Sequence, residues 1–212
     1  MGNPTLLGLV IVSAILTIRA KYRGPLVRVW IFKPLTMLLI LWAVVSIGIA
    51  HSAVYFYLIL SGLVFSLAGD VFLMLPKERF IPGLAAFLVA HLFYASAFTF
   101  QSGFGWTWWI LSPLLIFGSS MLVLLLPHTG KMKIPVTLYM LVILIMVWQA
   151  WERWNRLRQG NALLAAIGAV LFLFSDSLLA WNRFRKSFKS AEVLKLGSYF
   201  TAQWMIAISV GG

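Results

Sequence analysis

The chain has 212 residues, of which 62% are hydrophobic and 10% charged, and its mean hydropathy is +0.96. This composition excludes a soluble domain, because no loop between the apolar runs exceeds roughly a dozen residues. Cysteine is absent, which excludes disulfides, thiolate catalysis and cysteine-ligated metal. The net charge of +12 does not indicate nucleic acid, because the basic residues fall in short loops, where they act as topology signals and anionic-lipid contacts.

Eight apolar runs of about 20 residues predict transmembrane helices. They cover residues 4–20, 34–50, 54–75, 80–101, 106–126, 133–151, 160–181 and 192–210. The first run lacks a basic leader and a cleavage site, so we expect it to be retained as a helix. We therefore expect an all-α, polytopic integral membrane protein with a single domain over residues 1–212. Short loops make sequential helices antiparallel neighbours, and the halves suggest a weak four-plus-four repeat.

The basic residues predict the orientation. Fourteen lysines and arginines lie in the odd-numbered loops and their flanks, against only Arg153, Arg156 and Arg158 in the even-numbered loops. Because basic loops stay in the cytoplasm, we expect both termini outside, in a bacterial inner membrane.

Two aspartates lie within apolar runs, Asp70 in 61–75 and Asp176 in 171–181. A carboxylate at membrane depth is costly unless it is paired, solvated or protonated, and therefore marks a candidate functional site. Each lies five residues before the end of helices that run the same way, about 7–8 Å inside the membrane edge. We expect the pair to share one cavity. The alternative is a structural charge that a cation such as Lys33 neutralises.

Other polar residues are less specific. Lys33, before Pro34 at the expected helix start, is either a topology signal or a counter-ion or phosphate anchor. A lone buried histidine or tyrosine, such as His91 or Tyr94, is more often a hydrogen-bonded core residue than a catalyst. The glutamates are interpreted as solvated charges: Glu78, Glu152 and Glu192. The three histidines lie at different depths and predict no metal site: His51, His91 and His128.

Five short motifs in order make the chain resemble the YhhN-like membrane protein family, whose animal members are lysoplasmalogenases (alkenylglycerophospholipid hydrolases). The motifs are Phe32-Lys-Pro-Leu-Thr36, Ser66-Leu-Ala-Gly-Asp70, Gly83–Phe87 with His91-Leu-Phe-Tyr94, Phe174-Ser-Asp-Ser-Leu-Leu179, and Tyr199-Phe-Thr-Ala-Gln203. The resemblance implies hydrolysis of the vinyl ether of lysoplasmalogens to a fatty aldehyde and glycerophosphoethanolamine or glycerophosphocholine, without cofactor or metal. The family's paired aspartates fall on Asp70 and Asp176.

This chemistry leads to a hypothesis in which one aspartate is the acid and the other stabilises the cation and activates water, with the assignment open. The substrate-binding or orienting residues would be Lys33, Ser66, His91, Tyr94, Ser175, Tyr199 and Gln203. The expected partners are a lysophospholipid and membrane lipids, with no nucleic acid. Two alternatives are a proton-coupled transporter and a non-catalytic lysolipid-binding protein.

Overall fold

The computed structural model describes residues 4–50, 52–75, 79–186 and 188–211. Over these residues the chain forms eight long α-helices and three short 3₁₀ turns. The helices are α1 (Pro4–Arg23), α2 (Leu26–Ile47), α3 (Ala53–Met74), α4 (Phe80–Ser102), α5 (Trp108–Leu125), α6 (Lys133–Leu157), α7 (Gly160–Phe184) and α8 (Ala191–Ile208). The 3₁₀ turns are η1 (Leu126–His128), η2 (Gly130–Met132) and η3 (Ser209–Gly211).

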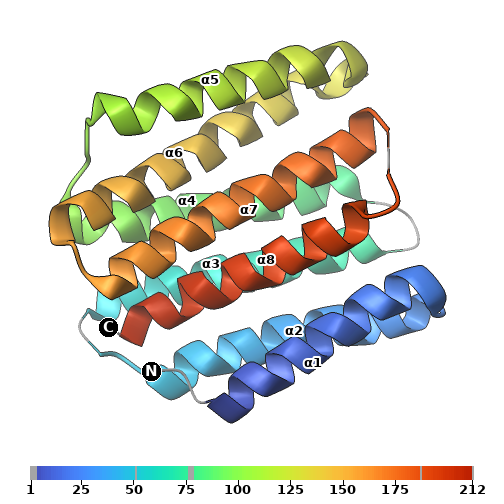
Figure 1. The fold of residues 1–212 in the computed structure, drawn as a ribbon, viewed down its shortest axis with the longest axis horizontal. Coiled ribbons are helices and arrows are strands. Elements are labelled where there is room, and N and C mark those ends of the chain that lie inside the picture. Colours follow the sequence, from blue (N-terminus) through green and yellow to red (C-terminus); the bar gives the residue numbers. More distant parts are fainter. Residues whose placement is uncertain (1–3, 51, 76–78, 187, 212) are drawn as a thin grey trace.

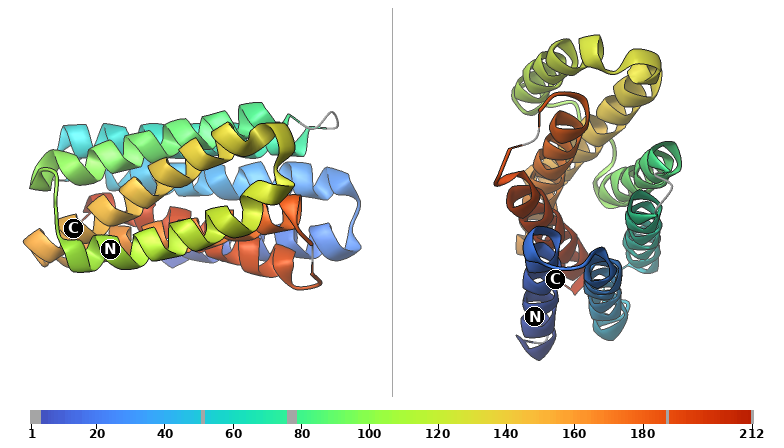
Figure 2. Two further views of the ribbon diagram at one scale, coloured as in Figure 1. Left: turned by 90° about the horizontal axis from the view of Figure 1, so that it is seen from above. Right: turned by 90° about the vertical axis from the view of Figure 1, so that its right-hand side faces the viewer.

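The helices run side by side, with all connections at the two ends of the bundle (Figure 1). The α3–α4 and α7–α8 hairpins are the most extensively packed pairs, and α6 packs against both α4 and α7. The α1–α2 hairpin closes one side through α2, which touches α3 and α8, while α5 covers the outside of α6 (Figure 2). We call the end with the α1–α2, α3–α4, α5–α6 and α7–α8 connections the basic end.

Seven helices, α1 to α7, are long and apolar enough to cross a membrane. The chain is thus an all-α, multi-pass membrane protein. The eighth helix, α8, falls outside this group because its 18 residues include Glu192, Lys195 and Gln203. It nevertheless lies alongside α7 for most of its length (Figure 1), and its inner residues Tyr199 and Gln203 are buried.

The predicted start of the second helix is wrong. Helix α2 begins at Leu26, eight residues before the expected 34, and Pro34 is inside it. Proline removes one backbone donor and normally disfavours a helix interior, which is why the sequence suggests a start there. Lys33 therefore lies on the second turn of a continuous helix, with its side chain directed into the bundle, where it is 13% exposed.

The interpretation of Glu152 as a solvated charge is also wrong. Helix α6 continues to Leu157, six residues beyond the prediction, and Glu152 is 1% exposed on it. Its carboxylate accepts hydrogen bonds from the Thr107 backbone N–H at 2.6 Å, the Thr107 hydroxyl at 2.8 Å and Trp148 Nε1 at 3.0 Å. Glu152 thus fastens the α4–α5 connection to α6, at the end opposite the basic end. Glu78 and His51 lie outside the described residues.

Glycines allow the two main hairpins to pack closely. A Cβ on Gly62 would lie 2.3 Å from the Tyr94 ring, and one on Gly69 would lie 2.7 Å from the Phe87 ring, so two aromatic rings of α4 pack directly on the α3 backbone. On the other hairpin, a Cβ on Gly168 would lie 3.0 Å from the Ala202 carbonyl oxygen of α8. Small residues at helix contacts are how membrane helices approach each other.

Candidate active site

A polar cavity of about 260 Å³ lies at the basic end, between the α3–α4 hairpin, the α7–α8 hairpin and α2. Asp70 and Asp176 both line it, as their matched depth predicts, although they are 106 residues apart in the chain. Both carboxylates are nearly shielded from the outside, with exposures of 1% and 9%. Two helices that run in the same direction have therefore brought two acids into one partly enclosed space.

Asp70 is held by a cation and a phenol. Lys33 Nζ lies 2.7 Å from its Oδ1, and the Tyr199 hydroxyl donates to its Oδ2 at 2.7 Å. Lys33 Nζ also lies 5.8 Å from the centre of the Tyr199 ring, so the three groups form one cluster from α2, α3 and α8. The sequence left open whether Lys33 is a topology signal, a phosphate anchor or a counter-ion, and the structure shows it as the counter-ion of Asp70.

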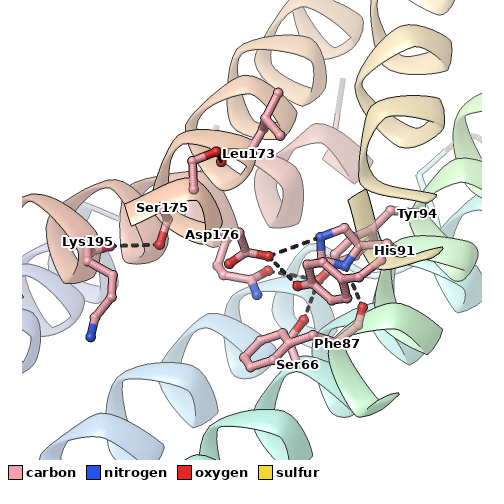
Figure 3. A network of polar contacts seen from close by, with 11 residues as sticks. Ser66, Phe87, His91, Tyr94, Leu173, Ser175, Asp176 and Lys195 are labelled. Atoms are coloured by element: carbon pink, nitrogen blue, oxygen red, sulfur yellow. Dashed lines mark hydrogen bonds and ion pairs between the residues drawn. The ribbon is translucent and has the colours of Figure 1, made fainter. Parts of the chain in front are cut away.

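Asp176 has different neighbours. The Tyr139 hydroxyl donates to its Oδ2. His91 Nε2 lies 3.5 Å from the same oxygen (Figure 3). The other ring nitrogen of His91, Nδ1, bonds to the Phe87 carbonyl oxygen. A carbonyl can only accept, so Nδ1 carries the hydrogen and Nε2 is left facing the carboxyl group. His91 Nε2 thus faces the Asp176 carboxyl group at ion-pair distance, without a hydrogen bond to it.

Three further predicted residues form a buried network behind the cavity. The Tyr94 hydroxyl donates to Gln203 Oε1 at 2.8 Å and lies 3.5 Å from the Ser66 hydroxyl oxygen. All three side chains are fully buried, on α4, α8 and α3. None of them lines the cavity. Their link to it is indirect, because the Tyr94 ring packs near Phe172, which packs against the cavity-lining Tyr199. The interpretation of Tyr94 as a hydrogen-bonded core residue agrees with this position.

The mouth of the cavity is positively charged. Besides Lys33, it is lined by Lys21, Arg183 and Lys195, from α1, α7 and α8. Lys195 Nζ is 2.7 Å from Glu192 Oε1, and Glu192 itself lines the cavity. The Ser175 hydroxyl, next to Asp176, donates to the Lys195 backbone carbonyl at 2.9 Å and so ties α7 to α8 here (Figure 3). Such a mouth suits a ligand that carries an anionic group such as a phosphate.

Sequence reasoning missed Tyr139, which holds Asp176 from α6. Its signal was weak but present: a tyrosine in an apolar helix, six residues from the basic end, at a depth similar to that of the aspartates. Glu192, interpreted above as a solvated charge, is instead half-buried and lines the cavity together with Lys195, because the first turn of α8 faces the cavity. Within the described ranges, no three His, Asp or Glu side chains are grouped in a way that could hold a metal ion.

Comparison with known proteins identifies the family. The YhhN family profile matches residues 29–210. The chain is 32% identical to the uncharacterized membrane protein YhhN of Escherichia coli O157:H7, over 95% of this chain and 96% of that protein. It is 35% identical to human lysoplasmalogenase TMEM86B over 73% of this chain and 64% of that protein. The mouse lysoplasmalogenase TMEM86B is also 35% identical, over 82% of this chain and 70% of that protein.

No solved structure matches the chain. The profile covers α3 to α8 in full and α2 from Val29 on, and hence the residues that contact Asp70 or Asp176 from other helices: Lys33, His91, Tyr139 and Tyr199. By its sequence, from within α2 to the C-terminal turn, this chain is a member of the YhhN family.

Proposed function

We propose that the protein is a membrane hydrolase that cleaves the vinyl ether bond of lysoplasmalogens. The products are a fatty aldehyde and a glycerophospho-alcohol, such as glycerophosphoethanolamine. The observation that carries this proposal is the pair of buried aspartates on one cavity whose mouth is lined by lysine and arginine. The printed function of the animal relatives, lysoplasmalogenase, gives independent support.

The two carboxyl groups suit this reaction. A vinyl ether is hydrolysed when an acid protonates its β-carbon, which leaves an oxocarbenium ion that water captures. The resulting hemiacetal then collapses to the aldehyde and the alcohol. Glycosidases stabilise a similar cation with two carboxyl groups, one as acid and one facing the cation. Asp70 and Asp176 supply both groups.

The rest of the site fits a lysophospholipid. Lys21, Arg183 and Lys195 are placed to attract a phosphate at the mouth, where a lipid headgroup would lie. Tyr199 and Tyr139 each donate to one aspartate and would fix its orientation. A salt bridge that served only the fold would have no need of a second carboxylate or a cavity beside it. The Lys33–Asp70 pair has both.

The direct test uses purified protein in detergent and lysoplasmenylethanolamine as substrate, with aldehyde release as the readout. We expect turnover by the natural chain, and a loss of about 100-fold or more in Asp70→Asn and in Asp176→Asn, as is typical when a general acid or base is removed. Glu152→Gln is the matched control. It makes the same carboxyl-to-amide change at a buried position at the far end of the bundle, and should keep its turnover per folded molecule.

Two results would contradict the proposal. One is wild-type turnover by both folded asparagine variants. The other is no aldehyde release by the natural chain together with gradient-dependent solute uptake in proteoliposomes, which would favour a proton-coupled transporter. Saturable lysolipid binding without product would instead indicate a binding protein.

A further inference from the structure

A second, apolar crevice meets the polar cavity at Asp176. It lies between α4, α6 and α7, close to the basic end, and has a volume of about 30 Å³. Its walls are almost entirely hydrocarbon, from side chains such as Leu84, Val136, Met140 and Leu173. Among the residues that the structure describes, three line both spaces: Phe80, Asp176 and Leu179. One carboxyl group therefore lies at the boundary between a charged cavity and an apolar crevice.

Asp70 lies on one side of this boundary only. It lines the polar cavity but not the crevice, and its two oxygens are engaged by Lys33 and Tyr199. Tyr139 in contrast links Asp176 to the crevice, because it is one of the crevice-lining residues and its hydroxyl donates to that carboxyl group. The two aspartates therefore differ in what can reach them: polar groups at Asp70, and both polar and apolar groups at Asp176.

The crevice also has an outer opening and an inner wall. Leu84, Ala180 and Phe184 are half-buried, so the crevice reaches the outer surface of the bundle, where lipid lies. Phe80 separates it from the polar cavity, with its ring 5.9 Å from that of Phe184 and 4.9 Å from the Arg183 guanidinium carbon. An alkyl chain could thus enter from the membrane while its headgroup remains at the charged mouth.

A lysoplasmalogen also has a polar part and an apolar part, one on each side of the bond that is cleaved. The glycerophosphate lies on the oxygen side of its vinyl ether, and a long hydrocarbon chain lies on the β-carbon side. Resting on the function proposed above, we infer that the alkenyl chain leaves Asp176 through the crevice and runs past Leu84, Ala180 and Phe184 toward the lipid, and that Asp176 is therefore the proton donor to the β-carbon. Asp70, on the polar side, faces the oxocarbenium ion and the attacking water.

With these roles, each aspartate returns to its starting protonation state at the end of the reaction. Protonated Asp176 gives its proton to the β-carbon, the C=C electrons form the new C–H bond, and the positive charge is shared between the α-carbon and the ether oxygen. Water then adds to the α-carbon and gives a proton to Asp70. When the hemiacetal collapses, its C–O bond to glycerol breaks, Asp70 returns its proton to the glycerol oxygen, and the hemiacetal hydroxyl returns one to Asp176. One water is consumed and both aspartates are restored.

Chain-length dependence tests the crevice. Ala180→Phe would fill it, whereas Val170→Phe makes a similar change on the exposed face of the same helix. Each methylene that loses its contacts should cost about fourfold in kcat/KM. We expect Ala180→Phe to lower kcat/KM for a substrate with an alkenyl chain of about 18 carbons by at least about tenfold, with little effect on one of about 4 carbons. Val170→Phe should change neither.

Equal loss on both substrates, or no loss on either while the protein stays folded, would overturn the chain site. A thermal-shift assay can measure binding of saturated alkyl-ether lysolipids of the same two lengths. Because these lipids are not hydrolysed, the assay tests the crevice without turnover. It therefore separates a failure of this inference from a failure of the proposed function, which would show as no aldehyde release by the natural chain.

Azide tests the roles of the aspartates. A small anion and nucleophile can replace a carboxylate that faces a cation and its water, but it cannot replace a proton donor. We therefore expect sodium azide to restore turnover to Asp70→Asn and not to Asp176→Asn, with loss of the vinyl ether as the readout. Restoration of Asp176→Asn alone would reverse the two roles, and restoration of both or neither would contradict the assignment.

Discussion

Lys33 Nζ lies 2.7 Å from Asp70 Oδ1, although the lysine belongs to a helix whose sequence suggests a break beside it. Helix α2 runs through Pro34, and this continuity places the ammonium group on the face that α3 and α8 share. The pair is shielded, with the two side chains 13% and 1% exposed. A charge in such a position depends on its partner much more than one at the surface.

Loss of Lys33 should therefore destabilise the fold as well as the site. Removing one partner of a buried ion pair typically costs about 3–5 kcal/mol, because the other charge is left uncompensated. We expect Lys33→Met to lower the thermal unfolding midpoint clearly, measured by tryptophan fluorescence in detergent. The double variant Lys33→Met/Asp70→Asn should recover most of that loss, since it removes both charges. Additive losses in the double variant would show that the pair is not energetically coupled.

The two tyrosines should affect turnover with little change in fold. Tyr199→Phe and Tyr139→Phe each remove one hydrogen bond to a carboxyl group and keep the ring. A hydrogen bond to a charged group is worth about 1.5–3 kcal/mol. We expect kcat to fall by about 10- to 100-fold, because the bond becomes stronger as charge develops in the transition state. Tyr57→Phe, at a tyrosine that is 57% exposed, is the matched control and should keep full kcat.

Glu152→Gln should lower stability and leave the site alone. The carboxylate accepts two bonds from Thr107 and one from Trp148, and an amide cannot accept all three on equal terms. We expect the unfolding midpoint to drop, by the equivalent of about 1–3 kcal/mol, with kcat per folded molecule unchanged. An unchanged midpoint would mean that the α4–α5 connection is held without Glu152.

Gly69→Ala should disturb the site through packing alone. The new methyl group would lie 2.7 Å from the Phe87 ring, closer than carbon atoms can approach, so α3 or Phe87 has to move. The Phe87 carbonyl orients His91, and Gly69 precedes Asp70, so we expect reduced kcat together with a lower unfolding midpoint. Gly197→Ala is the matched control: nothing lies within 4 Å of a Cβ there, and alanine favours a helix. It should be neutral or stabilising in both assays.

The sequence by itself determined the class of the protein and the location of its two acids. Apolar runs of about 20 residues predict membrane-spanning helices, and their order followed from that constraint. Their bounds did not, because α2 begins eight residues earlier and α6 ends six residues later than predicted. Asp70 and Asp176 were distinctive because a carboxylate is costly in an apolar run. Their equal distance from the helix ends was enough to place them in one cavity, which the structure shows.

The tertiary structure decided what surrounds each acid. The partners of Asp70 come from α2 and α8, and those of Asp176 from α4 and α6, so no single helix carries either set. Periodicity shows which residues share a face of one helix, but not which faces of different helices meet. That is set by how the helices pack, for example by the Tyr94 ring on Gly62 and the Phe87 ring on Gly69. For this reason Tyr139 and the position of the apolar crevice beside Asp176 became visible only in three dimensions.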